Sequence, residues 1–202
     1  MSDAVETVSF LRMEDGTEAD YALLTRLEED FAAGLPDRLL AQLRGLADGL
    51  SGYKIDRLQH SLQSATRARR DGADDDWVVA ALLHDVGDAI APYNHDSIAA
   101  DILAPYVRAE VTWVVRHHGI FQLAYYGDKV GEDPEARAKF ADSPHYQKAV
   151  IFCERWDQTA FDPDYPTDSL ESFEPLVRAV FARKAWSPDV LQEGVAHPLV
   201  SA

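Results

Sequence analysis

The chain has 202 residues, and 47% of them are hydrophobic, which is enough to bury one substantial core. Its 19 Lys and Arg residues stand against 35 Asp and Glu residues, and the resulting formal charge of -16 at pH 7 opposes binding to nucleic acid phosphates. No apolar run approaches the roughly 20 residues of a membrane span, so we expect neither nucleic acid nor membrane as a partner.

The beginning of the chain carries no recognisable targeting signal. Met1–Glu6 lacks the basic and apolar regions of a signal peptide. The lone Cys153 cannot form an internal disulfide and lies in an apolar run, as expected for a core thiol in a reducing compartment. These features predict a cytoplasmic protein and leave its oligomeric state open.

Two amphipathic helices are expected in the first quarter of the chain. Apolar residues recur at helical intervals from Tyr21 to Phe31, and Pro36 begins a second helix with a stripe of leucines. We expect both helices to bury these faces. Residues 1–52 would then form a helical segment packed on a domain that comprises residues 53–202.

The next two helices are expected to form the centre of the fold. A helix over about 55–70 places His60 close to its inward face and Arg57 on its solvent face. Asp74 and the two aspartates after it offer an N-cap and dipole partners for a helix from Trp77 to His84. That helix is apolar almost all round, so it should be the central one.

The remaining sequence continues this helical pattern. We expect a helix around Ile98 to Leu103, and another that starts at Pro105 and ends at Gly119. An aromatic loop is expected from Phe121 to Asp133. Further helices are predicted over Tyr146–Ala160 and Leu170–Phe181. The predicted fold class is all-α, a single helical bundle with short loops.

His84 and Asp85 stand together where the central helix ends. Adjacent helical residues point about 100° apart, but both can aim at one point beyond the helix end. A metal ion is the usual reason for such a pair, and the alternative is a chance pair in which a histidinium favours the helix C-terminus.

Other donors also lie on or beside apolar helices. The six nitrogen and oxygen donors are His60, His84, Asp85, His95, His118 and Asp157. Converging from five elements, they would hold two first-row transition metals with one carboxylate bridging, and iron, manganese and zinc all suit such donors.

This order of donors resembles the HD-domain superfamily over roughly Tyr53 to Asp157. The resemblance implies that His60, His84, Asp85 and Asp157 are the basic metal ligands, and that His95 and His118 complete a dinuclear site. We prefer His118 over His117 because the ligand is typically the residue just before the chain leaves the helix.

Two segments resemble one branch of that superfamily, the small mixed-valent diiron oxygenases. These are Tyr53–Gln63, similar to their tyrosine-containing lid and ligand helix, and Glu154–Gln158, similar to their last ligand helix. The Gly-Tyr-Pro signature of the cyclic dinucleotide phosphodiesterases is missing. The resemblance implies two iron ions, Fe(II) and Fe(III), as cofactor, and O2 with a small hydroxylated phosphonate as substrates.

The block Arg116–Gln122 with Tyr125–Gly127 is most similar to members that act on 1-hydroxy-2-(trimethylammonio)ethylphosphonate. The implied reaction cleaves the carbon–phosphorus bond to give glycine betaine and phosphate. Members that act on the primary amine have a histidine where Asp88 stands and a lysine near Gln122. A negative Asp88 would suit a quaternary ammonium group.

Four residues are therefore candidate substrate contacts: Tyr53, Asp88, Gln122 and Arg155, the last as a fork of donors to the phosphonate. Aromatic faces recognise trimethylammonium groups. The aromatic candidates near ligands are Tyr53, Tyr93, Phe121, Tyr125, Tyr126, Trp156 and Phe161.

Two alternative functions remain. One is an HD phosphohydrolase acting on a nucleotide or phosphoester, in which the same ligands activate water, and the other is a non-catalytic binding domain.

Overall fold

A computed structural model describes residues 6–187. Within this range the chain is helical with no strand, which confirms the all-α prediction. No helix in this range is both long and apolar enough to cross a membrane. The α-helices are α1 (Glu18–Ala33), α2 (Leu35–Gly45), α3 (Arg57–Arg70), α4 (Asp75–Leu83), α5 (His95–Leu103), α6 (Ala109–Val130), α7 (Tyr146–Ile151) and α8 (Leu170–Phe181). Short 3-10 helices are η1 (Met13–Asp15), η2 (Leu46–Asp48) and η3 (Ala136–Phe140), and η4 (Phe152–Asp157) is π-helical.

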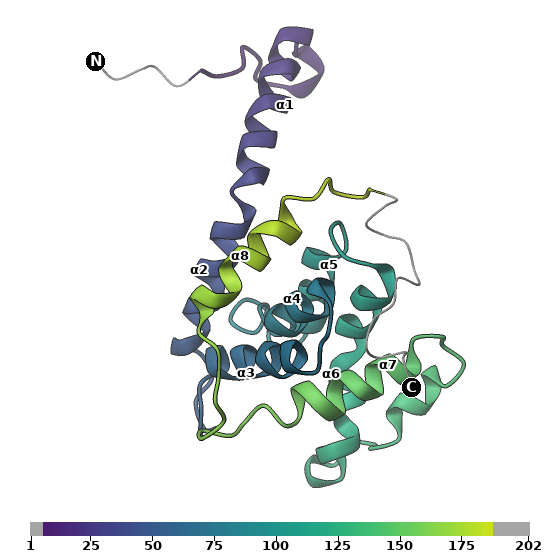
Figure 1. The fold of residues 1–202 in the computed structure, drawn as a ribbon. Helices are drawn as coiled ribbons and strands as arrows, with labels where there is room; N and C mark the ends of the chain where they lie inside the picture. The colour runs from purple at the N-terminus through teal and green to yellow at the C-terminus, as the bar shows by residue number, and fades with distance from the viewer. Residues whose placement is uncertain (1–5, 188–202) are drawn as a thin grey trace.

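Helices α3 and α4 lie side by side at the centre of the molecule (Figure 1). Every residue of α4 from Asp76 to Leu83 is buried, as the sequence predicted for a helix that is apolar almost all round. Asp74 caps this helix by accepting a hydrogen bond from the backbone N–H of Trp77. The end of α4 therefore delivers His84 and Asp85 into the interior.

The two N-terminal helices differ in their surroundings. Helix α2 buries three leucines against α3 and α8, as expected. Helix α1 instead projects from the body (Figure 1), and Tyr21, Leu27 and Phe31 are 38%, 43% and 68% exposed. The prediction that this face lies in the core is wrong. Helical periodicity shows that an apolar face exists, but it does not supply a neighbour to cover that face.

Helix α6 is longer than the sequence suggested. It continues through Gly119 and ends at Val130, where Gly131 with φ of 79° provides a left-handed cap. The predictions of a helix end at Gly119 and of an aromatic loop after it are wrong. Phe121 is fully buried against Tyr146, and this packing outweighs the low helix propensity of glycine and aromatic residues.

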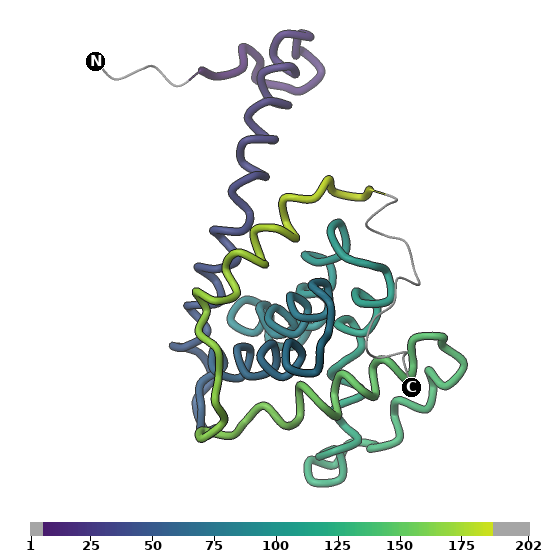
Figure 2. The backbone as a smooth tube through the Cα atoms, in the orientation of Figure 1, coloured from purple at the N-terminus to yellow at the C-terminus, as the bar shows by residue number. Residues whose placement is uncertain are grey.

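The predicted helix over Tyr146–Ala160 is present as α7 followed by η4. The backbone N–H of Gln158 donates to the carbonyl of Cys153 over 2.9 Å, five residues back. The chain then runs along α3 on its way to α8 (Figure 2). Gln63 and Arg67 fix this passage by donating to backbone carbonyls of Asp162 and Thr159. Asp157 thus faces the same interior as α3 and α4.

Candidate metal centre

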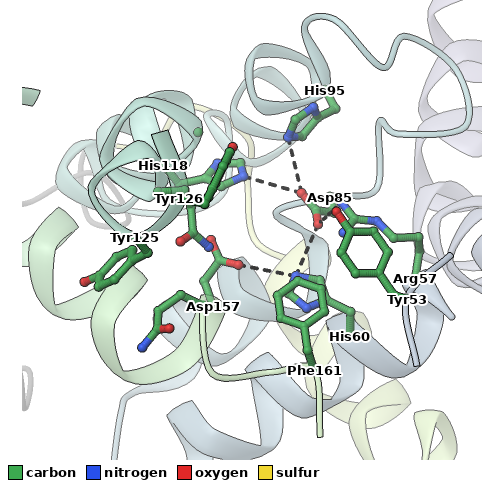
Figure 3. Close-up of a pocket in the computed structure, with 13 residues that line it drawn as sticks. Tyr53, Arg57, His60, Asp85, His95, His118, Tyr125, Tyr126, Asp157 and Phe161 are labelled. Carbon is green, nitrogen blue, oxygen red and sulfur yellow. Dashed lines mark hydrogen bonds and ion pairs between the residues drawn. The ribbon is translucent and has the colours of Figure 1, made fainter. Parts of the chain in front are cut away.

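Six side chains from five elements meet in the middle of the bundle. His60 comes from α3, His84 and Asp85 from the end of α4, His95 from the first residue of α5, His118 from the middle of α6, and Asp157 from the last residue of η4. Figure 3 shows His60, Asp85, His95, His118 and Asp157 pointing toward one another from the walls of a pocket. Five of the six are almost fully buried, and only the side chain of His95 is partly exposed, at 23%.

Gly87 allows the turn after Asp85 to lie directly against the start of α5. A Cβ atom at this position would lie 2.8 Å from the carbonyl oxygen of His95 and 2.9 Å from its Cα atom. The glycine is therefore required by close approach and not by a left-handed backbone. This contact sets the distance between Asp85 and His95.

The first group of donor atoms gathers around His60 and His84. Their Nε2 atoms lie 3.1 Å apart, and Asp157 Oδ1 lies 3.3 and 3.5 Å from them. Asp85 Oδ2 lies 3.3 Å from both nitrogens. Donors bound about 2.1 Å from one ion are spaced about 3.0–3.4 Å apart. The four atoms are therefore spaced as the ligands of a single ion.

The second group uses the other oxygen of Asp85. Asp85 Oδ1 lies 3.3 Å from His95 Nε2 and 3.4 Å from His118 Nε2. One carboxylate thus joins both groups, with one oxygen directed to each. This arrangement can hold two ions bridged by Asp85.

All four histidines present the same nitrogen to the centre. Their Nδ1 atoms lie within hydrogen-bonding distance of backbone carbonyls: those of Ala160 (3.0 Å) for His60, Ala81 (2.8 Å) for His84, Pro92 (3.1 Å) for His95 and Val115 (2.6 Å) for His118. An Nδ1–H that donates to a carbonyl leaves the Nε2 lone pair free, which is the tautomer that a metal requires.

Asp157 gives a second indication that a cation belongs here. Its Oδ2 atom is buried, and it has no hydrogen-bond partner among the described residues. A buried carboxylate oxygen without a donor is costly unless a cation satisfies it. The donor set and this unsatisfied oxygen both fit a metal ion.

In the metal-free centre, the histidines and carboxylates shift one another's pKa values. Burial lowers the pKa of His60, but its hydrogen bonds with Asp157 and Asp85 outweigh burial and raise that pKa to about 9. Burial also opposes a raised pKa at His118, which hydrogen bonding to Asp85 nevertheless brings to about 9. Burial alone would raise the pKa of Asp85, but the nearby His84, His118, His60 and Arg57 hold it well below its usual range.

Arg57 is a site residue that the sequence analysis missed. The helical pattern predicts Arg57 on the solvent face, but its side chain is only 12% exposed and faces the pocket. Its Nη2 donates to Asp85 Oδ2 over 2.6 Å, and its Nε donates to Asp88 Oδ2 over 2.6 Å. Arg57 precedes His60 by three residues on α3, so helical geometry places both on one face, and this spacing was the available signal.

The pocket beside the donors has a volume of about 480 Å³. Gln122 lines it. Tyr53, Tyr125, Tyr126 and Phe161 line it as well (Figure 3). The other candidates lie elsewhere: Arg155 and Tyr93 are exposed away from the pocket, and Phe121 and Trp156 are fully buried core residues. Asp88 does not line the pocket but accepts a hydrogen bond from Arg57. His117 packs on Trp113 and Phe140.

Comparison with known proteins agrees with this geometry. Residues 57–148 match the family model of the HD domain. This part of the chain is similar to the HD domain. The match includes His60, the pair His84 and Asp85, His95 and His118, and confirms the resemblance that these residues suggested. The HD domain is a metal-binding fold, which accords with the donor groups found here.

The chain is also similar to [1-hydroxy-2-(trimethylamino)ethyl]phosphonate dioxygenase (glycine-betaine-forming) from Leisingera caerulea. The two are 25% identical over 181 residues, which cover 74% of this chain and 88% of the relative. The comparisons and the donor set together support a metal-dependent enzyme of the HD-domain type.

Proposed function

We propose that the six donors bind two iron ions, and that the protein is an O2-dependent diiron oxygenase that cleaves the carbon–phosphorus bond of 1-hydroxy-2-(trimethylammonio)ethylphosphonate. The products would be glycine betaine and phosphate. The single observation that carries the proposal is the position of Asp85, whose two oxygens each lie 3.3–3.4 Å from a different pair of histidine Nε2 atoms. The similarity to a phosphonate dioxygenase supports the choice of reaction.

The reaction balances without an external reductant. The carbon–phosphorus bond breaks, the hydroxyl-bearing carbon becomes a carboxylate, and the phosphorus gains an oxygen to become phosphate. O2 accepts four electrons, all from the substrate. The bound iron pair would supply the activation of O2. The protein must hold the phosphonate, hold the ammonium group, and keep stray water from the reacting carbon.

Arg57 is suited to hold the phosphonate. Among the described residues that line the pocket, it is the one Lys or Arg side chain. Burial lowers its pKa, but the charges of Asp85 and Asp88 outweigh burial and raise it, so the guanidinium stays charged. Ions bound at Asp85 would satisfy the carboxylate that Arg57 now contacts, and the Nη2 group would then be free for a phosphonate oxygen.

Aromatic faces are suited to hold the ammonium group. Tyr53 stacks on Phe161 with ring centroids 5.1 Å apart, and Phe161 stacks on His60 at 4.4 Å. Tyr126 stands across the same pocket (Figure 3). Burial and the nearby carboxylates raise the pKa of Tyr126, which keeps its phenol neutral. These rings offer the apolar, electron-rich surface that a trimethylammonium group needs.

The competing function is an HD phosphohydrolase. Arg57 would suit a phosphoester as well as a phosphonate, because both present anionic phosphorus oxygens. The two functions differ in their need for O2. We also retain as predictions the division of the chain into residues 1–52 and 53–202, and a cytoplasmic location.

The test is O2 uptake by protein that has been loaded anaerobically with Fe(II) and then partly oxidised. On addition of the hydroxylated phosphonate we expect one phosphate released for each O2 consumed. Phosphate release from nucleotides or phosphoesters without O2 uptake would establish the hydrolase instead. Protein loaded with Zn(II) is the matched control, because it keeps a divalent ion in the site without redox chemistry.

A further inference from the structure

We propose that Asp88 positions His95 and Arg57 and thereby sets the affinity of the second metal ion, the one between His95, His118 and Asp85. This inference rests on the proposed dinuclear centre. It gives Asp88 a role different from the ammonium contact expected from the sequence.

The two carboxylate oxygens of Asp88 contact different side chains, one His95 and the other Arg57. Asp88 Oδ1 lies 3.4 Å from His95 Nδ1, and Asp88 Oδ2 accepts from Arg57 Nε over 2.6 Å. Arg57 in turn donates to Asp85 Oδ2 over 2.6 Å. Asp88 is therefore linked directly to His95, which belongs to the second donor group alone, and through Arg57 to Asp85, which both donor groups share.

His95 needs this support more than the other histidines. It is the first residue of α5, and its side chain is 23% exposed, whereas the side chains of His60, His84 and His118 are at most 4% exposed. Its Nδ1 also lies 3.1 Å from the carbonyl oxygen of Pro92 in the preceding turn. The carboxylate of Asp88 is the charged neighbour that can orient this ring and strengthen its Nε2 as a ligand.

The second contact of Asp88 balances the charge of Arg57. With Asp88 present, the guanidinium is shared between two carboxylates. Without Asp88, its whole positive charge would face Asp85, where it would compete with a cation for that carboxylate. Arg57 contacts Asp85 Oδ2, the oxygen that faces the first donor group, so the specific weakening of the second ion follows from the loss of orientation at His95. The first ion keeps His60, His84 and Asp157, none of which Asp88 contacts.

Calorimetric titration of metal-free protein with Mn(II) tests this role. For the wild type we expect two sites. Asp88→Asn and Asp88→Ala should each weaken one site by about 10- to 100-fold, the usual effect of losing a partner of a ligating histidine, and leave the other within about threefold. Asp101→Asn is the matched control, because Asp101 also pairs with an arginine, Arg116, and lies on the same helix as His95 but is 70% exposed. This control should leave both sites unchanged.

The possible outcomes are separable. Equal weakening of both sites, or no change in either, in Asp88 variants that retain the wild-type melting temperature would overturn the role assigned to Asp88. A single site in the wild-type protein would instead overturn the proposed dinuclear centre itself. The number of Mn(II) sites in the wild type therefore tests the dinuclear centre. The difference in affinity between the two sites in the Asp88 variants tests the role of Asp88.

Discussion

Helices α1 and α4 both carry many apolar residues, but their surroundings are opposite. All but one of the nine residues of α4 are buried, whereas of the sixteen residues of α1 only Asp20 is buried. Asp20 forms a capping box with Thr17, and its carboxylate also accepts a hydrogen bond from the backbone N–H of Ser9. The difference shows that an apolar face on a helix does not by itself ensure burial, which depends on the elements that surround the helix. The same comparison ranks the expected effects of substitutions, which should be largest in buried α4 and smallest in exposed α1.

The largest effect on stability should come from Trp77 at the start of α4. Its side chain is fully buried and packs on Phe152 and Trp156. We expect Trp77→Ala to lower the free energy of unfolding by about 3–5 kcal/mol, because it leaves a large cavity. Urea denaturation followed by circular dichroism measures this change. A loss below about 1 kcal/mol would mean that α4 is not the centre of the core.

Substitution of Asp157 tests the metal ligands that lie beside this core. We expect Asp157→Ala to reduce metal affinity at the first site by about 100-fold or more, because it removes a ligand and not only a supporting residue. Metal analysis after equilibrium dialysis measures the loss. The matched control is Asp128→Ala, which removes a carboxylate that is 68% exposed on α6. Equal loss in both variants would argue for a general effect of charge.

Substitution of Gly87 tests the close contact between the turn after Asp85 and the start of α5 at His95. We expect Gly87→Ala to lower the free energy of unfolding by about 1–3 kcal/mol, because the added methyl group would overlap the backbone of His95. The second ion should weaken more than the first, since the displaced residue belongs to the second donor group. Gly45→Ala is the control, because a Cβ there meets nothing within 4 Å. Equal effects of the two substitutions would contradict this account.

The pH dependence of the metal-free protein should report the same histidines. Burial lowers the pKa of His60, but the carboxylates of Asp157 and Asp85 outweigh burial and raise it from the ordinary 6.5 to about 9. Burial also lowers the pKa of His118, and Asp85 outweighs it and raises that pKa to about 9. A raised folded-state pKa contributes stability that is complete below pH 6.5 and is lost as the pH rises through 9. We therefore expect the free energy of unfolding to fall between pH 6.5 and 9.

Metal loading should abolish this trend, because an ion then occupies the Nε2 atoms that protons occupied. Metal affinity should rise over the same range of pH as proton competition disappears. Urea denaturation with chelator or with added Mn(II), at pH 6.5, 7.5 and 9, measures both trends. A metal-free protein whose stability does not change from pH 6.5 to 9 would contradict the assigned hydrogen bonds.

The smallest effect should come from α1. Phe31 is 68% exposed, with Arg38 lying over its ring at 4.0 Å. We expect Phe31→Ala to change the free energy of unfolding by no more than about 0.5 kcal/mol. A loss near that of Trp77→Ala would show that this face is covered in solution, and sedimentation of the same samples would then show whether a second copy covers it.

Much of the candidate site was predictable because its donors lie on or beside apolar helices. The burial of α4 follows from its composition, and His84 and Asp85 follow from where that pattern stops. Arg57 was not recognised, because a charged residue on a helix ordinarily faces water. Only the fold shows the two carboxylates that hold it in the pocket.

The length of α6 was missed for a different reason. Gly119 in an aromatic and β-branched sequence suggested a helix end, but a glycine is tolerated inside a helix whose neighbours are well packed. The true end had a signal of its own in Gly131, which follows the last residue of the helix. Local propensity therefore failed where tertiary packing of Phe121 against Tyr146 decides the conformation.

The central claim is that Asp85 bridges two ions, and anomalous diffraction tests it most directly. Crystals of protein loaded with iron, measured on both sides of the iron absorption edge, should show two peaks. One should lie among His60, His84 and Asp157, the other between His95 and His118, and both should lie next to Asp85. A single peak, or a second peak that does not touch Asp85, would contradict the account.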